Sequence, residues 1–376
     1  MSEARKQQPT LELVAERAGV SRATVSRVVN GSEKVKPEAM RAVEQAIREL
    51  NYVPNRAARS LAQGRTNAIA LVVPENTAKF FADPYFAKVV QGAAQYLADT
   101  EFMLSLLLST ESDPGKTTRY LRGGNVDGAL VLSHHSADRS YADLGGQLPL
   151  VFGGRTMSTD QNEIYVVDID NIAAAKQATN VIIDRGRRRI ATIAGPQDMG
   201  ASLDRLTGFT QALAESGLEP AAVLEGDFTP DSGHHLMSQL IESGADIDGL
   251  FVASAQMAFG ALQAMAGAGL NIPQDVSVTT VDDDAFARNA VPPLTTIAQH
   301  PERQGAVMAE ILIKRINGES VPEWSIMDTE LILRASHYHS PGCPAFRREA
   351  GTQVKTEIPT LSSGNFTLCA QRDSNP

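Results

Sequence analysis

Short apolar runs that alternate with helical stretches are the feature of this sequence that most limits how the chain can fold. Four such runs follow Asn67, at residues 68–73 (AIALVV), 102–108 (FMLSLLL), 128–132 (GALVL) and 150–152. Helical patterns near 85–98 and 114–123 separate them. Near-continuous apolar runs are typical of strands that are buried on both faces of a parallel sheet with helical crossovers. The sequence therefore predicts a doubly wound parallel sheet, an α/β fold.

A second unit of the same kind begins near Val167. Its predicted strands lie at 190–194, 222–224, 250–253 and 276–281, and its predicted helices near 172–184, 203–216, 233–242 and 257–266. Ligands of open parallel sheets bind beyond the carboxyl ends of the strands, so two facing lobes place their loops around one shared cleft. We expect residues 66–335 to form this two-lobed effector-binding region. Residues 336–376 lack the alternation and are rich in Ser, Pro, Gly and Thr, which predicts a disordered tail.

The N-terminal stretch TLELVAERAGVSRATVSRVVNG, residues 10–31, has the pattern of a helix-turn-helix motif. Two helical patterns flank a turn at Gly19-Val20, Ser21 is placed as the N-cap of a second helix at about 22–29, and Asn30-Gly31 end that helix. Its outward side chains are those of Arg22, Ala23, Thr24, Ser26 and Arg27. Arginines can bond guanine edges in a major groove, and hydroxyls can bond phosphates. The alternative interpretation is an ordinary helical hairpin with a mildly basic, solvated face.

Two further segments complete the predicted N-terminal region. Pro37 suits the first position of a third helix, which gives a helix-turn-helix domain at 10–53 after a disordered lead at 1–9. Residues 54–65 include NRAARSLAQG, about two turns of helix, which are too short to be stable alone. We therefore expect a hinge helix at 54–65 that orders only on DNA and beside a second copy. Leu61 is placed to act as a wedge in the minor groove, and a plain linker is the alternative.

Charge divides the chain at the same boundary. The whole chain carries a net charge of −10, but residues 1–65 hold 12 Lys and Arg against 7 Asp and Glu, which is +5 and leaves −15 for the remainder. A basic head on an acidic body is the asymmetry expected of a protein whose head binds nucleic acid.

Several classes of protein lack support in the sequence. The two cysteines, both beyond residue 340, form no metal or disulfide pattern, which favours a reducing compartment. The N-terminus has no apolar signal region and no run approaches the roughly 20 apolar residues of a membrane helix, so we expect a cytoplasmic protein with no membrane contact. No nucleotide-binding or catalytic motif is found, and the pairs His134-His135 and His234-His235 are interpreted as surface residues. We therefore predict no catalytic residues, no metal and no cofactor.

Six segments make the chain resemble the LacI/GalR family of bacterial transcription repressors over roughly residues 10–333. They are the stretch 10–31, YVPNRAARSLAQGRT (52–66), DPYF (83–86), GRRRIATIAGP (186–196), DRLTGF (204–209) and PPLTTI (292–297). The resemblance implies a homodimer that reads a pseudo-palindromic operator in double-stranded DNA, and a body similar to periplasmic sugar-binding proteins. It also implies that the chain crosses between the lobes three times, near Asp168, Gln299 and Trp324.

The resemblance also implies roles for individual residues. On DNA, the residues that look like base readers are Arg22, Ala23 and Arg27, and those that look like phosphate-positioning residues are Ser21, Thr24, Ser26 and Asn30. The hinge that kinks the operator centre is matched by Tyr52, Asn55, Ala58, Leu61 and Ala62. In the cleft, the positions that hold the effector are Tyr85, Phe86, Arg205, Phe228 and Asp282.

The chemistry of the cleft residues suits a sugar. Aromatic rings stack on the C–H faces of a pyranose, and these could be supplied by Tyr85, Phe86 and Phe228. Paired bonds to vicinal hydroxyls come from guanidinium or carboxylate groups, here those of Arg155, Arg205 and Asp282. Core packing is the slightly favoured alternative for Phe86, and a cation site at residues 282–284 is the less favoured alternative to a sugar partner.

Two departures from the family pattern bear on the ligand. Where family members usually have Ala-Asn-Asp, this chain has Ala253-Ser254-Ala255, which leaves the Ser254 hydroxyl as the polar contact. The pair Gly153-Gly154 stands where many members have an aspartate, which opens space for a larger ligand. Together with FFADPYF at 80–86, this resembles members that respond to plant-derived oligosaccharides such as cellobiose.

The expected function is that of a sequence-specific repressor whose operator affinity is modulated by a small sugar. If the sugar prefers a conformation that separates the two hinge segments, it weakens DNA binding by the same factor by which DNA weakens sugar binding. A corepressor that tightens DNA binding is the alternative sign. The alternative function is a sugar-binding or sugar-processing protein with no role in transcription.

Overall fold

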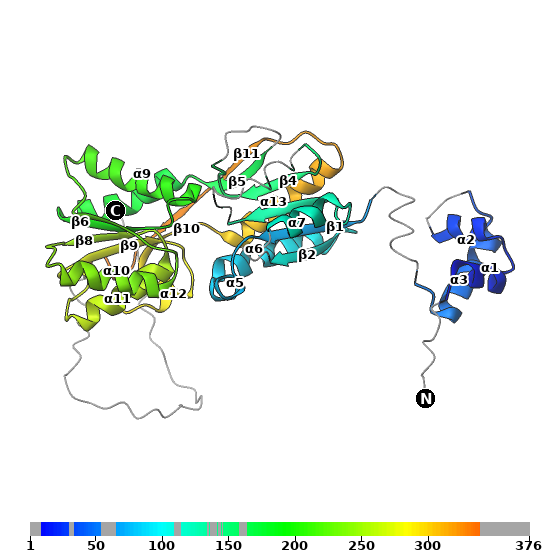
Figure 1. Cartoon of the computed structure of the whole chain (residues 1–376), viewed down its shortest axis with the longest axis horizontal. Coiled ribbons are helices and arrows are strands. Elements are labelled where there is room, and N and C mark those ends of the chain that lie inside the picture. The colour runs from blue at the N-terminus through cyan, green and yellow to red at the C-terminus, as the bar shows by residue number, and fades with distance from the viewer. Residues whose placement is uncertain are drawn as a thin grey trace, which may run out of the picture. The chain divides into compact units, whose positions relative to one another are not determined.

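The computed structural model describes residues 9–29, 34–53, 65–108, 114–133, 135, 141, 144, 146–157 and 164–338. The predicted lead, hinge helix and tail lie almost wholly outside these residues. The described part consists of a helical head and two α/β lobes (Figure 1). No helix within it is both long enough and apolar enough to cross a membrane.

Three helices form the head: α1 (Leu11–Ala18), α2 (Arg22–Val29) and α3 (Pro37–Leu50). Thr10 caps α1, because its Oγ1 accepts a hydrogen bond from the backbone of the first turn at 3.3 Å. Gly19 ends α1 in the left-handed conformation, with φ at 64°. Val14, Val25 and Val43, one from each helix, are fully buried in a common core. The predicted helix-turn-helix and its third helix are confirmed.

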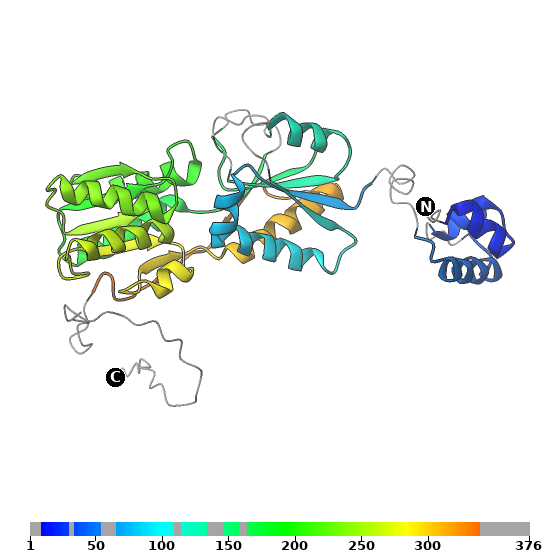
Figure 2. The same ribbon diagram turned by 60° about the horizontal axis from the view of Figure 1, so that its bottom comes forward.

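The first lobe, called the N-lobe here, is built on a six-stranded sheet of order β11-β5-β4-β3-β1-β2. Its strands pair in parallel and are β1 (Ala68–Val73), β2 (Met103–Leu108), β3 (Gly128–Leu132), β4 (Leu150–Gly153), β5 (Tyr165–Ile169) and β11 (Trp324–Met327). One face is covered by α6 (Pro84–Leu97) and α13 (Pro301–Ile316), and the other by α7 (Pro114–Arg122) (Figure 2). Because side chains alternate along a strand, Ile69 and Leu71 pack under α6 and α13, whereas Ala70 and Val72 pack toward α7.

The second lobe, the C-lobe, repeats this plan with a sheet of order β12-β10-β9-β8-β6-β7. Its strands are β6 (Ile190–Ala194), β7 (Ala222–Glu225), β8 (Gly249–Val252), β9 (Ser277–Val281), β10 (Thr295–Ala298) and β12 (Glu330–Ile332), of which β12 is antiparallel. The helices α8 (Asn171–Asp184) and α9 (Gly200–Glu215) pack together, as do α10 (Pro230–Glu242) and α11 (Ala255–Gly267). Two short helices, α5 (Thr77–Ala82) in the N-lobe and α12 (Ala285–Asn289) in the C-lobe, lie near the strand ends. The predicted pair of doubly wound lobes is confirmed.

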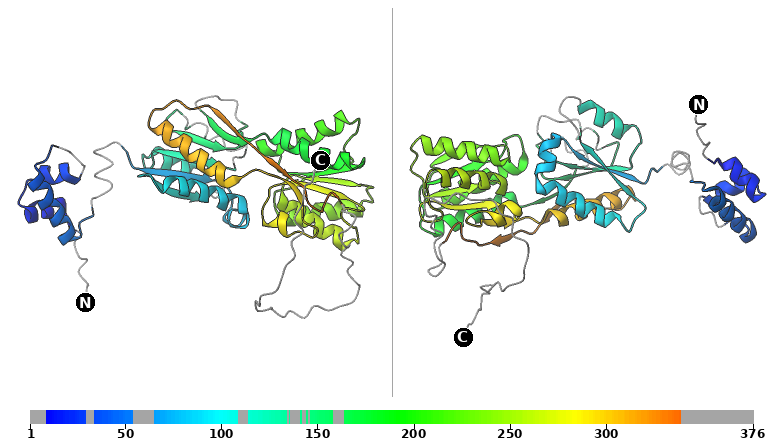
Figure 3. Two further views of the ribbon diagram at one scale, coloured as in Figure 1. Left: turned by 180° about the vertical axis from the view of Figure 1, so that it is seen from behind. Right: turned by 90° about the horizontal axis from the view of Figure 1, so that it is seen from below.

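The chain passes between the lobes three times. The crossings follow β5, β10 and β11, and Figure 3 shows β11 leading from the N-lobe toward the C-lobe. The first two lie at the predicted places, next to Asp168 and Gln299. The third lies at residues 328–329 rather than at Trp324, because Trp324 begins β11 and pairs with Val166 in the N-lobe sheet. Val167, expected to open the second unit, likewise belongs to β5 of the first.

The C-lobe extends past the boundary expected at residue 335. Ser336 is fully buried, its Oγ donates to the carbonyl of Val278 at 2.6 Å, and it accepts from the backbone N–H of Thr295 at 2.8 Å. His337 is also buried beside Thr295. The first residues of the predicted tail therefore join the lobe, because their polar groups are satisfied by β9 and β10.

Candidate functional site

The outward face of α2 carries the residues predicted to read DNA. Arg22, Ala23 and Arg27 are exposed, and Thr24 and Ser26 are half-buried. The Oγ of Ser21 accepts a hydrogen bond from the backbone N–H of Thr24 at 3.2 Å, which is the predicted N-cap. Guanidinium and hydroxyl groups thus lie on one helix face of a net-basic head, which suits a major groove.

Arg22 pairs with Glu12 of α1, at 3.0 Å from Nε to Oε1, and both side chains are more than half exposed. Water competes with such exposed ion pairs, so they are weak. A guanine edge or a phosphate can therefore replace Glu12 as the partner of Arg22.

The remaining predicted DNA contacts either lie outside the described residues or pack in the head core. Residues outside the described part are Asn30, Asn55, Ala58, Leu61 and Ala62. Tyr52 is described, and its side chain is only 7% exposed because it packs in the head core. Asn51 ends α3 in the left-handed conformation at φ 47°, and the backbone N–H of Tyr52 then bonds Ile47 O at 3.0 Å. The structure thus places the Tyr52 ring in the head rather than in the hinge.

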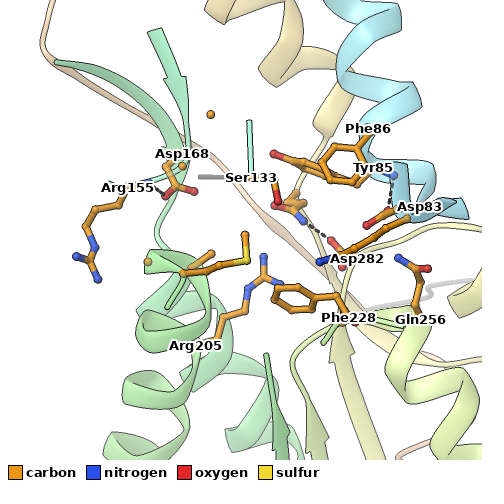
Figure 4. A pocket seen from close by; sticks show the side chains of 18 residues that line it. Asp83, Tyr85, Phe86, Ser133, Arg155, Asp168, Arg205, Phe228, Gln256 and Asp282 are labelled. Atoms are coloured by element: carbon orange, nitrogen blue, oxygen red, sulfur yellow. Dashed lines mark hydrogen bonds between the residues drawn. The ribbon is translucent and has the colours of Figure 1, made fainter. Parts of the chain in front are cut away.

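One cavity of about 110 Å³ lies where the carboxyl ends of the strands of both lobes meet (Figure 4). All seven predicted effector residues line it, namely Tyr85, Phe86, Arg155, Arg205, Phe228, Ser254 and Asp282. Polar lining residues that the sequence analysis did not select are Lys79, Asp83, Ser133, Asp168, Gln256 and Gln299. Ser133 and Gln299 directly follow strands β3 and β10, and that position was the signal that could have found them.

Arg205 is held rigidly on α9 with its fork directed into the cavity (Figure 4). Its side chain is 5% exposed, Nε donates to Asn171 Oδ1 at 2.9 Å, and Nη1 donates to the carbonyl of Ala253 at 2.7 Å. Nη2 has no hydrogen-bond partner among the described residues and is free to donate to a ligand. A guanidinium fixed in this way recognises a hydroxyl pair with little loss of conformational freedom.

Asp282 lies at the end of β9 with its carboxylate in the cavity. Its backbone is left-handed, with φ at 82°, and Gln299 Nε2 donates to its Oδ1. Burial raises the pKa of Asp282, and the charge of Arg205 opposes that shift. The cavity therefore presents a fixed donor and a fixed acceptor on the same C-lobe wall.

Phe228 supplies an aromatic surface in a strained backbone position. Its φ is 68°, which is uncommon for a bulky side chain and tends to occur where function requires it. The ring lies directly against Gly195, where a Cβ atom would come within 2.3 Å of Phe228 Cζ. Gly195 therefore permits the position of the ring.

The two N-lobe aromatic residues differ in how they are held. The hydroxyl of Tyr85 donates to Gln304 Oε1 at 2.8 Å, and Gln304 Nε2 donates to Val167 O at 2.9 Å. Phe86 is 3% exposed and stacks on Phe80, with ring centroids 5.5 Å apart. Phe86 thus borders the cavity but packs mainly in the N-lobe core, as the alternative interpretation expected.

Arg155 differs from its expected role as a ligand clamp. Its guanidinium binds both carboxylate oxygens of Asp204 on α9, at 3.0 Å from Nε and 2.7 Å from Nη2, and points away from the cavity centre (Figure 4). Its backbone N–H donates to Asp168 Oδ2 at 2.9 Å. In this conformation Arg155 links the lobes instead of offering a free donor to the ligand.

Acidic and basic side chains line the cavity in equal number, with Asp83, Asp168 and Asp282 on one side of the balance and Lys79, Arg155 and Arg205 on the other. Burial raises the pKa of Asp83 to about 6 and that of Asp284 to about 7, and the neighbouring charge of Asp282 adds to both shifts. Burial also raises the pKa of Asp168. A lining without an excess of either charge favours an uncharged, hydroxyl-bearing ligand over an ion.

The residues considered for a cation have other partners. Asp283 binds Arg288 at 3.0 Å and Arg334 at 2.6 Å, and Asp284 Oδ1 caps α12. In the described part of the chain, no group of three or more His, Cys, Asp or Glu side chains is arranged to hold a metal ion.

The two departures from the family pattern have structural counterparts. Ser254 is 4% exposed, and its Oγ caps α11 by accepting from the backbone N–H of Met257 at 3.4 Å, which leaves the hydroxyl hydrogen for the cavity. Gly154 has φ at 114°, a conformation that other residues rarely adopt, and a Cβ atom placed there would have Asp168 Oδ2 as its nearest neighbour, at 4.0 Å. The cavity is therefore open beside Gly154.

Two family models match the sequence. The model described as bacterial regulatory proteins, lacI family, matches residues 10–55, and the model described as periplasmic binding protein-like domain matches residues 179–337. The transcriptional regulator CelR of Thermobifida fusca is 44% identical over 338 residues, which cover 88% of this chain and 99% of CelR.

Two solved structures agree with these matches. A CelR–cellobiose complex has a TM-score of 0.69 and 42% identity, over 88% of this chain and 100% of that chain. The lac repressor dimer bound to operator and an anti-inducer has a TM-score of 0.79 and 27% identity, over 89% of this chain and 100% of that one. With similarity that spans head and lobes alike, the chain belongs to the lacI family of bacterial regulatory proteins.

Proposed function

We propose that this protein is a transcriptional repressor that binds a pseudo-palindromic operator as a homodimer and changes its operator affinity when a saccharide occupies the cavity between the lobes. The observation that carries the proposal is the convergence of all seven predicted effector residues on one cavity in a chain that begins with a helix-turn-helix head. The regulators similar to it support the assignment of the saccharide as an effector rather than a substrate. Such a regulator acts at the nucleoid, where its operators lie.

Cellobiose is the saccharide that we expect to bind first. The relative of known structure with 42% identity is a complex with cellobiose. The cavity offers an aromatic ring at Phe228, a fixed donor at Arg205 and a fixed acceptor at Asp282, which are the groups that a neutral sugar needs. The open side at Gly154 gives room for a second ring.

Helix α13 provides a physical connection between the cavity and the chain that leads to the head. Its first residues follow Gln299, which bonds Asp282, and its Gln304 bonds Tyr85. At its other end, Arg65 donates to Asn317 Oδ1 at 3.2 Å and to the carbonyl of Ile316 at 3.1 Å. A cation bound to terminal carbonyls stabilises a helix end. Movement of α13 on ligand binding is thereby passed to Arg65, the last residue of the predicted hinge.

Exposed apolar side chains support the homodimer. Tyr96 of α6 is 37% exposed, and Met103 and Leu106 of β2 are 53% and 40% exposed. The helix and the strand pack against each other, and β2 is an edge strand. Apolar groups gathered at a sheet edge are typical of a surface that a second copy covers.

The proposal is tested by selecting genomic fragments that bind the full-length protein and then measuring their affinity by fluorescence anisotropy with and without cellobiose. A coupling of about 1 to 3 kcal/mol predicts a change in operator affinity of about 5- to 150-fold. If the operator affinity is the same with and without each saccharide of a neutral panel, the allosteric role is contradicted. Saccharide binding without any selected DNA would instead identify a sugar-binding protein with no role in transcription, and turnover of an aryl glycoside would identify an enzyme.

A further inference from the structure

A short segment of the C-lobe, residues 198–204, contacts the N-lobe beside the cavity, and we call it the closure seam. It comprises the end of the loop after β6 and the first turn of α9. Its contacts with the N-lobe include an imidazole–carboxylate bond from His135 to Asp198, a backbone approach of Gly200 to Arg155, and the ion pair of Arg155 with Asp204. A Cβ on Gly200 would lie 2.4 Å from the carbonyl oxygen of Arg155, so the approach is close.

His135 lies between carboxylates of opposite lobes. Its Nε2 is 3.2 Å from Glu75 Oε1 in the N-lobe, and its Nδ1 is 2.8 Å from Asp198 Oδ2 in the C-lobe. An ionised carboxylate only accepts hydrogen bonds, and a neutral imidazole has a single N–H. Both bonds therefore form together only when both ring nitrogens carry hydrogen, which is the cationic form of the ring. The interpretation of His135 as an ordinary surface residue is wrong, since its side chain is 26% exposed and doubly bonded.

The groups around His135 keep its N-lobe partner ionised. Ser133 Oγ and Lys79 Nζ also donate to Glu75 Oε1. Although burial opposes ionisation, the bonds from His135 and Ser133 lower the pKa of Glu75 to about 2. The bonds to Glu75 and Asp198 in turn raise the pKa of His135. The charged groups that face the ring in the described residues are thus Glu75 and Lys79 from the N-lobe and Asp198 from the C-lobe.

We propose that His135 is a positioning residue of the effector cavity, which holds the lobes closed over the saccharide only while its ring is cationic. The proposal rests on the proposed binding of a saccharide in this cavity. Since Glu75 belongs to the same lobe as His135, closure of the lobes adds only the bond to Asp198.

The sign of the pH dependence follows from this arrangement. Closure raises the pKa of His135, so by linkage a ligand that favours the closed form binds more tightly at low pH. The gain is complete below the pKa of the open form, which the bond to Glu75 already raises, and is lost as pH rises through the higher pKa of the closed form. The ion pair of Arg155 with Asp204 persists through this range, so binding is weakened rather than abolished.

The test measures cellobiose affinity of the full-length protein by calorimetry from pH 5.5 to 9. We expect the wild-type affinity to fall about 3- to 10-fold across this range, since one pKa unit corresponds to a factor of ten. In His135→Gln and in Asp198→Asn, this pH-dependent fall in cellobiose affinity should disappear. The matched control, His235→Gln, removes an exposed imidazole on α10 and should keep the pH-dependent fall in cellobiose affinity. Titration of Asp83 and Asp284 remains in every variant and cancels in the comparison. Identical profiles for wild type and His135→Gln would overturn the proposal.

A second measurement does not depend on the ligand. In protein labelled with ¹³C in its histidine rings, His135 is assigned by the signal that His135→Gln removes. Its pKa should lie above the ordinary range in the wild type and fall in Asp198→Asn, and an unchanged value in that variant would overturn the proposal. If no saccharide binds at any pH, the proposed function fails, whereas this titration still decides whether the bond between the lobes exists.

Discussion

Arg155 of the N-lobe donates a hydrogen bond to each carboxylate oxygen of Asp204 of the C-lobe, at 3.0 Å from Nε to Oδ2 and 2.7 Å from Nη2 to Oδ1. A guanidinium engaged in this way joins the two lobes at the edge of the cavity. Arg155→Ala and Asp204→Asn should therefore have the same effect, a weakening of cellobiose binding by about 3- to 10-fold, or about 0.6 to 1.4 kcal/mol. Calorimetry checks this. If only the arginine variant loses affinity, Arg155 contacts the ligand directly, as the sequence had suggested.

Arg205 should be required for the response to the ligand and dispensable for DNA binding. Its Nη2 faces the cavity, while Nε and Nη1 are bonded to Asn171 and Ala253. We expect Arg205→Lys, which keeps the charge but not the planar fork, to weaken cellobiose binding by at least about tenfold. Ligand-free operator affinity should stay within about twofold, as anisotropy would show. Loss of operator binding together with a large drop in Tm would mean that Arg205 holds the C-lobe together instead.

Arg27 should read bases rather than only neutralise phosphates. Arg27→Ala is expected to cost about 1 to 3 kcal/mol at the selected operator and to change affinity for random DNA little. Arg48→Ala, which removes an equally exposed charge from α3, is the matched control. Equal losses on specific and random DNA would reduce Arg27 to a phosphate contact.

Arg65 should affect the coupling between the two ligands more than the binding of either. Arg65→Ala removes the bonds to Ile316 and Asn317 at the end of α13. We expect cellobiose affinity and ligand-free operator affinity to change by less than about threefold, while the ratio of operator affinities with and without cellobiose falls toward one. An unchanged ratio would show that α13 does not transmit the signal through this residue.

Asp284 should make the C-lobe less stable as pH rises. Burial, and secondly the charge of Asp282, raise its pKa from 3.8 to about 7, so the folded protein holds this proton more tightly than the unfolded chain. Stability contributed by the protonated form is lost between those two pH values. Asp284→Asn keeps the oxygen that caps α12 and should raise the free energy of unfolding at pH 8 by on the order of 1 to 3 kcal/mol. Denaturation at pH 4 should show little gain, and Asp184→Asn, an exposed change, should show none at either pH.

The sequence predicted the strands whose buried positions are filled by apolar residues. The runs at β1 and β3 have no polar residue, and the run at β6 has only Thr192; the structure buries nearly all of their side chains. β10 was missed because Thr295 and Thr296 fill buried positions with hydroxyls that bond Arg334 O and Asp282 O. β11 was missed because it is an edge strand whose Trp324 and Ile326 are 51% and 57% exposed.

The cavity was predicted better than the contacts around it. Arg205 and Asp282 lie within the region 10–333 that resembles the family, so their positions in that resemblance placed them. The bonds of His135 with Asp198 and of Arg155 with Asp204 join side chains 63 and 49 residues apart, and nothing local marks either pair. Such partnerships depend on how the two lobes meet, which a single sequence does not encode in any local pattern.

The last strands of both sheets, β11 and β12, come from the final part of the folded chain. Neither lobe can therefore be completed during synthesis until residues 324–332 have left the ribosome, whereas the described helices of the head end by residue 50. A nonsense mutation upstream of Trp324 would leave a complete DNA-binding head attached to incomplete effector-binding lobes. The truncated product would bind operators without responding to any sugar, or it would be degraded before it could bind.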